Sequence, residues 1–361
     1  AQELFVDTTV RSIGETLPVV LLRTAPATAP RGLLVVTVEA FHAAEGALGL
    51  RVCLEASEAH RILWSEIQAT PVRGAPDVSD PRVLGLSNRL VDAITQAVCE
   101  AAPQYAGDTD ASRLSLLAVE KIFSLQPSEL EAAEGLLLDA LALEQRGLFH
   151  GWLAQLYLMQ YVERFRGWDE VVDKAEQACA RALELEPLNS NVLATVSNAR
   201  LVLWKDLAVS GELARMGVDA NPANPLARWS LASAQLYYGR TEEAYSTARR
   251  AMHMAAGSRY RFWSDFQTAL TAAVMGRPLE AVQLSEAASA LRPGYRPPLR
   301  YLIALYAGNG MASKAATAAT KLTKIEPDFT VERMVADPED PISLMRNTGL
   351  LAADELRELS V

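Results

Sequence analysis

Residues 1–104 carry short apolar runs separated by turn residues, which predicts a small mixed α/β unit. Segment 2–17 has helical spacing, with Phe5 and Ile13 partly on one side. Four segments are continuously apolar or alternate apolar with polar residues, and they are predicted as strands: 18–23, 32–40, 48–56 and 60–68. Short turns join the later strands, so a locally antiparallel β-meander is expected.

The pattern then becomes helical. Residues 71–82 hold three prolines and two aspartates and are predicted as a loop. Helices are predicted over 84–101 and 109–124 from their apolar spacing. A further helix is predicted to start at a capping box formed by Ser128 and Glu131 and to end at Arg146-Gly147.

Prolines recur after Ala- and Leu-rich runs in the second half of the chain. The prolines are Pro187, Pro222, Pro293 and Pro327, and the intervals between them are 35, 71 and 34 residues. The long interval divides at Ala256 into 34 and 37 residues. Proline cannot continue a helix, so each of these residues is predicted to stop one. A recurring period of this length indicates a helical-repeat protein.

Small side chains recur in the same frame. Ten positions lie twelve or five residues before the four prolines and Ala256, and nine of the ten are Ala, Gly or Ser. These positions are Ala175, Ala182, Ser210, Gly217, Ala244, Ala251, Ala281, Ala288, Ala315 and Leu322. Antiparallel helices approach closely only where small side chains face each other, so the pattern predicts stacked helical hairpins.

Glycine recurs between the two helices of the clearest copies, at Gly239, Gly276 and Gly310, where it is predicted to end the first helix in a left-handed cap. With these features the sequence resembles the tetratricopeptide repeat (TPR) family, whose period is 34 residues. The three clearest copies of the repeat are 225–256, 262–293 and 296–327. A weaker copy is 191–222, and a fifth, at about 152–187, carries an insertion near Gly167.

Two further segments carry a second resemblance. Residues 49–67 look like the β-meander of the TolB-like α/β region that precedes a TPR array in some bacterial winged-helix regulators and class III adenylate cyclases. Residues 325–350 resemble the end of such arrays, where a last helix covers the exposed apolar face. The resemblance implies a mainly α fold made of a TolB-like α/β domain (1–104), linking helices (105–150), about five TPR hairpins (151–330) and a C-terminal capping helix (331–361).

The same resemblance implies a protein-interaction or sensory module, the regulatory part of a bacterial transcriptional regulator. The regulatory region of a cyclase, or a small-molecule sensor that uses the α/β domain, is the alternative. Because the chain starts at Ala1, it is expected to be cut from something longer. Nucleic-acid binding would then need a domain that this sequence does not contain, since neither a winged helix nor a cyclase carboxylate pair is found in it.

Charge and composition limit the classes of partner that the chain is expected to bind. A net charge of −10 and a pI of about 5.1 repel phosphate and anionic lipid, so no membrane contact is expected. The basic and aromatic residues of 249–263 are interpreted as the edge of a hairpin, with a local nucleic-acid or acidic-peptide contact as the alternative.

No apolar stretch is long enough to span a membrane. Cys53, Cys99 and Cys179 lack metal or redox spacing, which favours a reducing, cytoplasmic location.

Sequence signatures of catalysis are missing. His42, His60, His150 and His253 have no metal-binding spacing, apart from an isolated His42–Glu45 pair that is interpreted as a surface turn. Nucleophile-elbow, P-loop and dinucleotide-binding motifs are also missing. No catalytic residue, metal or cofactor is therefore expected, and an enzyme built from scattered residues is the alternative.

In TPR proteins the first helix of each hairpin lines a concave groove. The family positions that match this sequence give the candidate partner-binding residues Thr195, Ala199, Trp229, Ser233, Tyr237, Trp263, Phe266, Leu270 and Arg300. Such an apolar, aromatic groove would suit a protein or peptide partner, and a second copy of the chain is an alternative. The groove lacks the row of basic residues that clamps a peptide carboxylate in chaperone-binding TPR domains. Alternatively, Trp263 and Phe266 simply fill the interface between hairpins.

Overall fold

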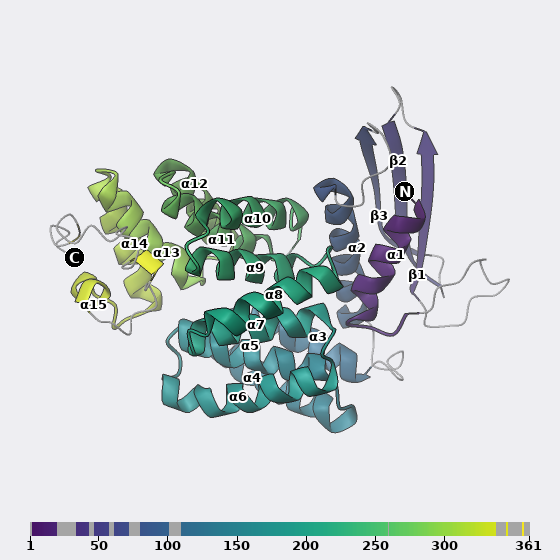
Figure 1. Ribbon diagram of the computed structural model, residues 1–361, viewed down its shortest axis with the longest axis horizontal. Coiled ribbons are helices and arrows are strands. Elements are labelled where there is room, and N and C mark those ends of the chain that lie inside the picture. The colour runs from purple at the N-terminus through teal and green to yellow at the C-terminus, as the bar shows by residue number, and fades with distance from the viewer. Residues whose placement is uncertain are drawn as a thin grey trace.

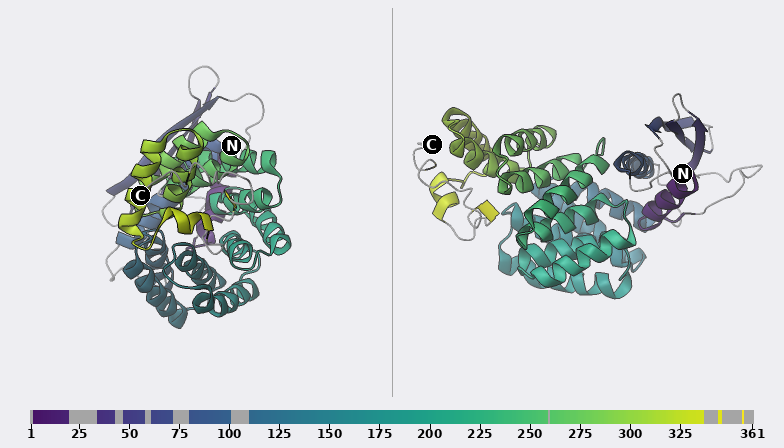
Figure 2. Two further views of the ribbon diagram at one scale, coloured as in Figure 1. Left: turned by 90° about the vertical axis from the view of Figure 1, so that its left-hand side faces the viewer. Right: turned by 45° about the horizontal axis from the view of Figure 1, so that its top comes forward.

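The computed structural model describes residues 2–19, 34–42, 47–57, 61–71, 80–100, 110–258 and 260–336, together with Leu344, Met345 and Leu356. Over these residues the chain forms a three-stranded sheet with two helices, followed by a curved array of helical hairpins (Figure 1). The sheet and the short helix α15 (Val331–Ala336) lie at opposite ends of the molecule. Figure 2 shows the hairpins arranged around a curved axis.

The N-terminal part is an antiparallel meander with both of its helices packed on one face. Its elements are α1 (Gln2–Gly14), β1 (Leu34–His42), β2 (Ala47–Ala56), β3 (Arg61–Pro71) and α2 (Pro81–Glu100). The strands pair in the order β1-β2-β3, as predicted. Val52 and Leu54 of β2 are fully buried against Phe5 of α1 and Leu90 of α2, while Ile62 of β3 is exposed. Alternation along the strands therefore gives one dry face, and that face positions both helices.

Three of the N-terminal predictions need correction or lie partly outside the described residues. Helix α1 ends at Gly14, three residues earlier than predicted, and Pro18 and Val19 are not in a strand. The rest of the predicted strand 18–23 lies outside the described part of the chain. Both ends of the predicted loop 71–82 are corrected, because Pro71 is the last residue of β3 and α2 begins at Pro81.

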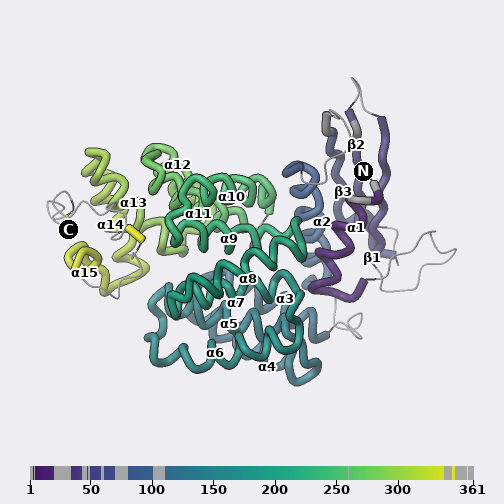
Figure 3. Tube along the Cα trace, in the orientation of Figure 1, coloured from purple at the N-terminus to yellow at the C-terminus, as the bar shows by residue number. Residues whose placement is uncertain are grey.

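The helical part consists of consecutive antiparallel pairs (Figure 3). Its helices are α3 (Asp110–Ile122), α4 (Pro127–Leu143), α5 (Gly147–Val162), α6 (Trp168–Leu185), α7 (Ser190–Leu203), α8 (Leu207–Ala220), α9 (Pro225–Tyr237), α10 (Thr241–Met254), α11 (Arg261–Val274), α12 (Pro278–Leu291), α13 (Arg296–Gly308) and α14 (Ala312–Ile325). The pair α3 and α4, predicted as linking helices, contributes Val119, Ile122 and Leu130 to the same apolar core as the later hairpins.

The repeat pattern is confirmed by the structure. Each of the four recurring prolines lies two residues beyond the end of a helix, as Pro187 does after α6. All ten recurring small-residue positions, from Ala175 to Leu322, are buried. Gly239, Gly276 and Gly310 have φ values of 77°, 72° and 70°, the left-handed conformation that glycine adopts without strain.

The predicted capping box at Ser128 is wrong. Helix α4 already begins at Pro127, and its N-cap residue is Gln126, which makes no side-chain capping bond. Proline is well suited to the first position of a helix, so the helix starts one residue before the serine. At its other end α4 stops at Leu143, and Gly147 begins α5. A Cβ on Gly147 would lie 2.6 Å from the carbonyl oxygen of Ala182, so glycine allows this close helix contact.

Only part of the predicted capping helix 331–361 falls within the described residues. Helix α15 covers six residues, and its Val331 and Met334 are buried. Met345 and Leu356 join the main core, while Leu344 joins a smaller cluster on α9 and α10. Apolar side chains from this region therefore belong to the core of the array, and the assignment of 331–361 as a capping helix stays a prediction.

Candidate functional site

The predicted groove residues lie on the first helices of four hairpins, α7, α9, α11 and α13. Six of the nine are buried: Thr195, Ala199, Ser233, Trp263, Phe266 and Arg300. Trp229, Tyr237 and Leu270 are partly buried. The described structure tests burial but no partner binding, so the assignment of these residues to a partner remains a prediction.

Aromatic rings cluster where the groove was expected. The rings of Trp229 and Trp263 meet edge to face, with centroids 4.7 Å apart. The ring centroid of Phe123, just beyond α3, lies 4.9 Å from that of Trp263 and 4.4 Å from that of Tyr260, and the Trp152 ring of α5 lies 6.3 Å from it. Edge-to-face pairs of this kind stabilise packing beyond the area that they bury. Trp263 thus fills an interface between helices and also contributes to the wall of a cavity.

Arg300 differs from the other predicted residues because its charge is neutralised inside the array. Its side chain is 1% exposed, and its guanidinium lies 2.6 Å from the Glu326 carboxylate. It also donates to the carbonyl oxygen of Val162. A cation held in this way by buried partners is a structural group in the conformation described.

Two other predicted residues pack against an apolar cluster that includes a residue of the C-terminal region. Leu344 forms this cluster with Leu236 and Ala244, and Tyr237 and Leu270 pack against it. Leu344 therefore belongs to the same apolar packing as two residues that were predicted to bind a partner.

The N-terminal helix α1 contacts the start of α7. The Glu15 carboxylate just beyond α1 accepts hydrogen bonds from the Ser190 hydroxyl at 2.6 Å, the Ser190 backbone N–H at 3.1 Å and the Asn221 amide at 3.2 Å. Burial raises the pKa of Glu15, and these hydrogen bonds and the charge of Arg11 oppose that rise. Arg146 and Asn189 donate to the backbone carbonyl of Glu15.

Helix α2 contacts the turns that precede α9 and α11. The Asn88 amide donates to the carbonyl oxygens of Ala223 and Met254, and Arg89 donates to that of Ala256. Leu84 adds an apolar contact with Ala223 and Met254. Both N-terminal helices are thus joined to the array mainly through hydrogen bonds to its turns.

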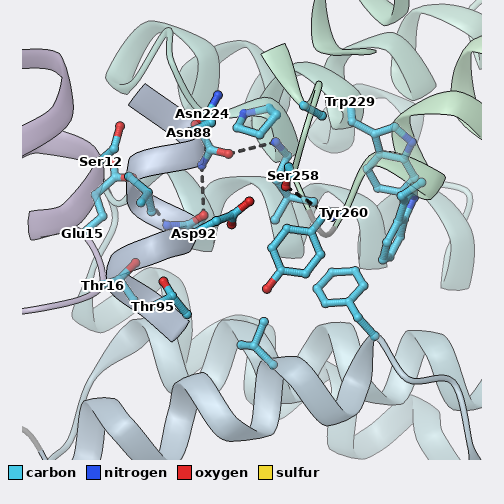
Figure 4. A pocket seen from close by; sticks show the side chains of 18 of the residues that line it. Ser12, Glu15, Thr16, Asn88, Asp92, Thr95, Asn224, Trp229, Ser258 and Tyr260 are labelled. Atoms are coloured by element: carbon cyan, nitrogen blue, oxygen red, sulfur yellow. Dashed lines mark hydrogen bonds between the residues drawn. The ribbon is translucent and has the colours of Figure 1, made fainter. Parts of the chain in front are cut away.

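A cavity of about 150 Å³ lies between these two helices and the array (Figure 4). Ser12 and Glu15 border it from the α1 side, and Asn88 and Asp92 from α2, while Trp229 and Tyr260 lie on the array side. Phe123, Trp152 and Trp263 complete an aromatic end. The cavity therefore has one polar end and one aromatic end.

This cavity was not predicted from the sequence. Asn189 and Asn224, which precede α7 and α9, are typical helix N-caps and could be recognised locally. The hydrogen bonds of Asn189 and Ser190 to Glu15, however, cross more than 170 positions of sequence, and no local pattern reports such a contact. Phe123 and Trp152 lie upstream of the repeats from which the groove was derived.

The remaining chemistry-bearing residues show no catalytic arrangement in the described part of the chain. No cluster of three His, Cys, Asp or Glu side chains that could hold a metal is found there. Burial lowers the pKa of His150 and raises that of the Cys179 thiol to about 12. His60, and Glu45 of the His42–Glu45 pair, lie outside the described residues.

The basic and aromatic segment 249–263 divides into separate contacts. Arg249 pairs with Glu280 at 2.9 Å, and Arg261 pairs with Asp265 at 3.2 Å. Tyr260 and Trp263 face the cavity. Arg259 lies outside the described residues. No helix in the described ranges is long and apolar enough to cross a membrane.

Comparison with known proteins yields fold similarity only. Neither protein-family models nor curated proteins match the sequence. Among solved structures, the chain is similar to the APC/C hetero-tetramer Cut9–Hcn1, with a TM-score of 0.50 and 12% identity over 77% of this chain and 57% of that one. At this identity the similarity supports the helical-repeat fold and nothing more specific.

Two further solved structures match with lower TM-scores. The pilus biogenesis factor PilW matches with a TM-score of 0.42 and 16% identity, over 65% of this chain and 98% of that chain. YrrB, described as a TPR protein with an unusual peptide-binding site, matches with a TM-score of 0.34 and 17% identity, over 53% and 93% of the two chains. Together with the 34-residue hairpin frame, the fold defines a TPR-like superhelix with an N-terminal three-stranded sheet.

Proposed function

We propose that this chain is a protein- or peptide-interaction module whose inner array surface is regulated by its own terminal segments. The observation that carries the proposal is the cluster of Leu344 with Leu236 and Ala244, against which Tyr237 and Leu270 pack. First helices in helical-repeat arrays form extended concave surfaces suited to peptides. A partner segment with apolar side chains would replace Leu344 on this surface.

The finer role we propose is that of the regulatory part of a cytoplasmic bacterial transcriptional regulator. Support comes from the resemblance of residues 49–67 and 325–350 to the TolB-like and terminal regions of such proteins. The regulatory region of a cyclase remains the second candidate on the same resemblance. Sequencing the coding region upstream of Ala1 separates the two, because a winged helix implies DNA and paired carboxylates imply a nucleotide.

Affinity capture from a bacterial lysate tests the interaction. Leu344→Glu should expose the surface and increase capture of the partner, because a charge is disfavoured in an apolar cluster. Tyr237→Ala combined with Leu270→Ala should reduce capture of the same protein. Leu143→Glu, at a residue that is 63% exposed, is the matched control and should leave capture unchanged.

All variants are first shown to be folded by circular dichroism. If wild type and the Tyr237/Leu270 double variant capture the same proteins in equal amounts, the inner surface is not the partner site. A second copy of the chain is tested separately by light scattering of wild type and Leu344→Glu at several concentrations. Concentration-dependent dimers of Leu344→Glu would identify the chain itself as the occupant.

A further inference from the structure

The cavity between the N-terminal helices and the array has the size of a small-molecule site. Its volume of about 150 Å³ is close to that of engineered protein cavities that bind benzene. Residues from α1, α2, α3, α5, α7, α9 and α11 contribute to its wall. A ligand inside it would therefore touch both parts of the protein at once.

One end of the cavity offers aromatic carbon surface. The rings that line this end are those of Phe123, Trp152, Trp229, Tyr260 and Trp263. They pack on one another, because Phe123 contacts Trp152, Tyr260 and Trp263, and Trp229 contacts Trp263. The indole nitrogens of Trp229 and Trp263 are buried, so these two rings present carbon atoms to the cavity. This end therefore suits an apolar or aromatic group.

The other end of the cavity is acidic. Glu15, just beyond α1, and Asp92 of α2 both contribute carboxyl groups to the wall, as Figure 4 shows. Among the lining residues that the structure describes, none carries a basic side chain. The other polar side chains of this wall, such as the amide of Asn88, are neutral. The wall thus holds negative charge at one end and apolar surface at the other.

The charge of Glu15 is stabilised by neutral groups. Its carboxylate accepts hydrogen bonds from the Ser190 hydroxyl, the Ser190 backbone N–H and the Asn221 amide. Burial nevertheless raises its pKa, and these hydrogen bonds and the charge of Arg11 oppose that rise only in part. A positive charge placed beside this carboxylate would therefore be stabilised by it. A second anion would instead be repelled by it.

We propose that this cavity binds a small organic cation, a primary amine that carries one aromatic or bulky apolar group, of the size and chemistry of benzylamine. The ammonium group pairs with the carboxylates of Glu15 and Asp92, and the apolar group fills the aromatic end. Because the N-terminal helices and the array together form the wall, binding stabilises their docked arrangement. This inference is independent of the protein partner proposed above.

A ligand series on the unmodified protein tests the proposal. Benzylamine is compared with benzyl alcohol, which lacks the charge, with benzoate, which reverses it, and with methylamine, which lacks the ring. Calorimetric titration measures affinity, and tryptophan fluorescence reports occupancy because Trp152, Trp229 and Trp263 line the cavity. Benzylamine should bind saturably with a stoichiometry of one.

The three analogues should bind at least about tenfold more weakly than benzylamine. Benzyl alcohol loses a charge-assisted hydrogen bond, methylamine loses the apolar contact, and benzoate is repelled by the two carboxylates. Affinity of benzyl alcohol or benzoate equal to that of benzylamine would overturn the proposal. Absence of saturable benzylamine binding would overturn it as well.

Conservative variants locate the ammonium site. Asp92→Asn and Glu15→Gln each keep the size of the side chain and remove its charge, so the preference for benzylamine over benzyl alcohol should fall about fivefold or more in each. Glu3→Gln removes an exposed carboxylate of α1 that does not line the cavity, and should leave the preference unchanged. Thermal unfolding first shows that all three variants are folded.

Two outcomes would contradict the assignment to this cavity. If Asp92→Asn and Glu15→Gln both keep the full preference, the ammonium group does not lie between these carboxylates. If Glu3→Gln lowers the preference as much as they do, the amine responds to the net charge of the protein. Capture of a protein partner from a lysate is a separate measurement, so failure of either proposal is distinguishable from failure of the other.

Discussion

The carboxylate of Glu15 lies 2.6 Å from the hydroxyl of Ser190, the first residue of α7. The backbone N–H of Ser190 donates to the same carboxylate at 3.1 Å. A helix N-terminus has unsatisfied N–H groups and a positive dipole end, so an anion is stabilised there. This contact joins the sheet-bearing part of the chain to the repeat array.

Replacing Glu15 by alanine should lower the free energy of unfolding by about 1–3 kcal/mol, because the buried donors of Ser190 and Asn221 lose their acceptor. Urea denaturation of wild type and variant measures the difference. Glu3→Ala removes an exposed carboxylate from α1, the helix that ends just before Glu15, and is the control. Equal stability of the two variants would mean that the Glu15 contact contributes nothing to docking.

Close helix packing at Gly217 gives a second prediction. A Cβ built on Gly217 would lie 3.3 Å from the Cβ of Ala227 and 3.4 Å from that of Leu193. Gly217→Val should therefore destabilise the array by about 1–3 kcal/mol through overpacking. Gly135 lies in α4, and a Cβ built on it would have no neighbouring atom within 4 Å. Gly135→Val should therefore change stability by less than about 0.5 kcal/mol. Thermal unfolding distinguishes them, and similar melting temperatures would contradict the packing argument.

The repeats were predictable because their signals are local and periodic. Ala175, Gly217 and Pro187 each mark a position that recurs every 34 residues or so, and each is found where the hairpin geometry requires it. The meander was predictable because alternation along β2 places Val52 and Leu54 on one face. Periodic patterns report burial directly, so sequence reasoning recovers them.

The cavity and the burial of the groove residues could not be predicted from the sequence, because both depend on contacts between distant segments. Arg300 matches a groove position in its repeat, yet Glu326 at the end of the second helix of the same hairpin neutralises it inside the array. Leu344 joins Leu236 and Ala244 in the cluster against which Tyr237 packs, although more than 90 positions of sequence separate it from them. Nothing in the local sequence of Arg300 or of Tyr237 specifies the residues that pack against it.

The buried carboxyl group of Glu163 is expected to make the stability of the protein depend on pH. It is fully buried at the end of α5, near Arg296 and Arg300 of α13 and near Glu326. Burial raises its pKa from 4.5 to about 7, an effect that the two arginines oppose and Glu326 increases. Between these two values the folded state binds more protons at this site than the unfolded state does. The stability contributed by this group is therefore greatest at low pH and falls as the pH rises through that window.

Glu163→Gln should remove this pH dependence. The variant should gain stability relative to wild type as the pH rises from 5 to 8, by up to about 3 kcal/mol. The free energy of unfolding in urea at several pH values measures the difference between the two proteins. Glu131→Gln, at an exposed position of α4, is the control substitution. A constant difference between wild type and Glu163→Gln across this range would show that the Glu163 pKa is not raised.

Arg300 provides the last prediction and separates a structural role from a partner-binding one. Arg300→Ala leaves the Glu326 carboxylate, which is 2% exposed, without its nearest cation. Removing one member of a buried ion pair typically costs about 3–5 kcal/mol, whereas replacing both members by apolar residues costs much less. Arg300→Met combined with Glu326→Met should therefore recover most of the stability that Arg300→Ala loses in urea denaturation.

The control for this experiment is Arg228→Ala, on the first helix of another hairpin, where the guanidinium donates to the backbone carbonyl of Pro222 and no buried carboxylate is left behind. It should cost less than about 1.5 kcal/mol, the loss of one hydrogen bond. If Arg300→Ala is as stable as wild type, the ion pair with Glu326 is not structural, and Arg300 becomes available to a partner. If Arg300→Ala is strongly destabilised, a loss of partner capture in that variant reports unfolding of the array rather than a missing contact.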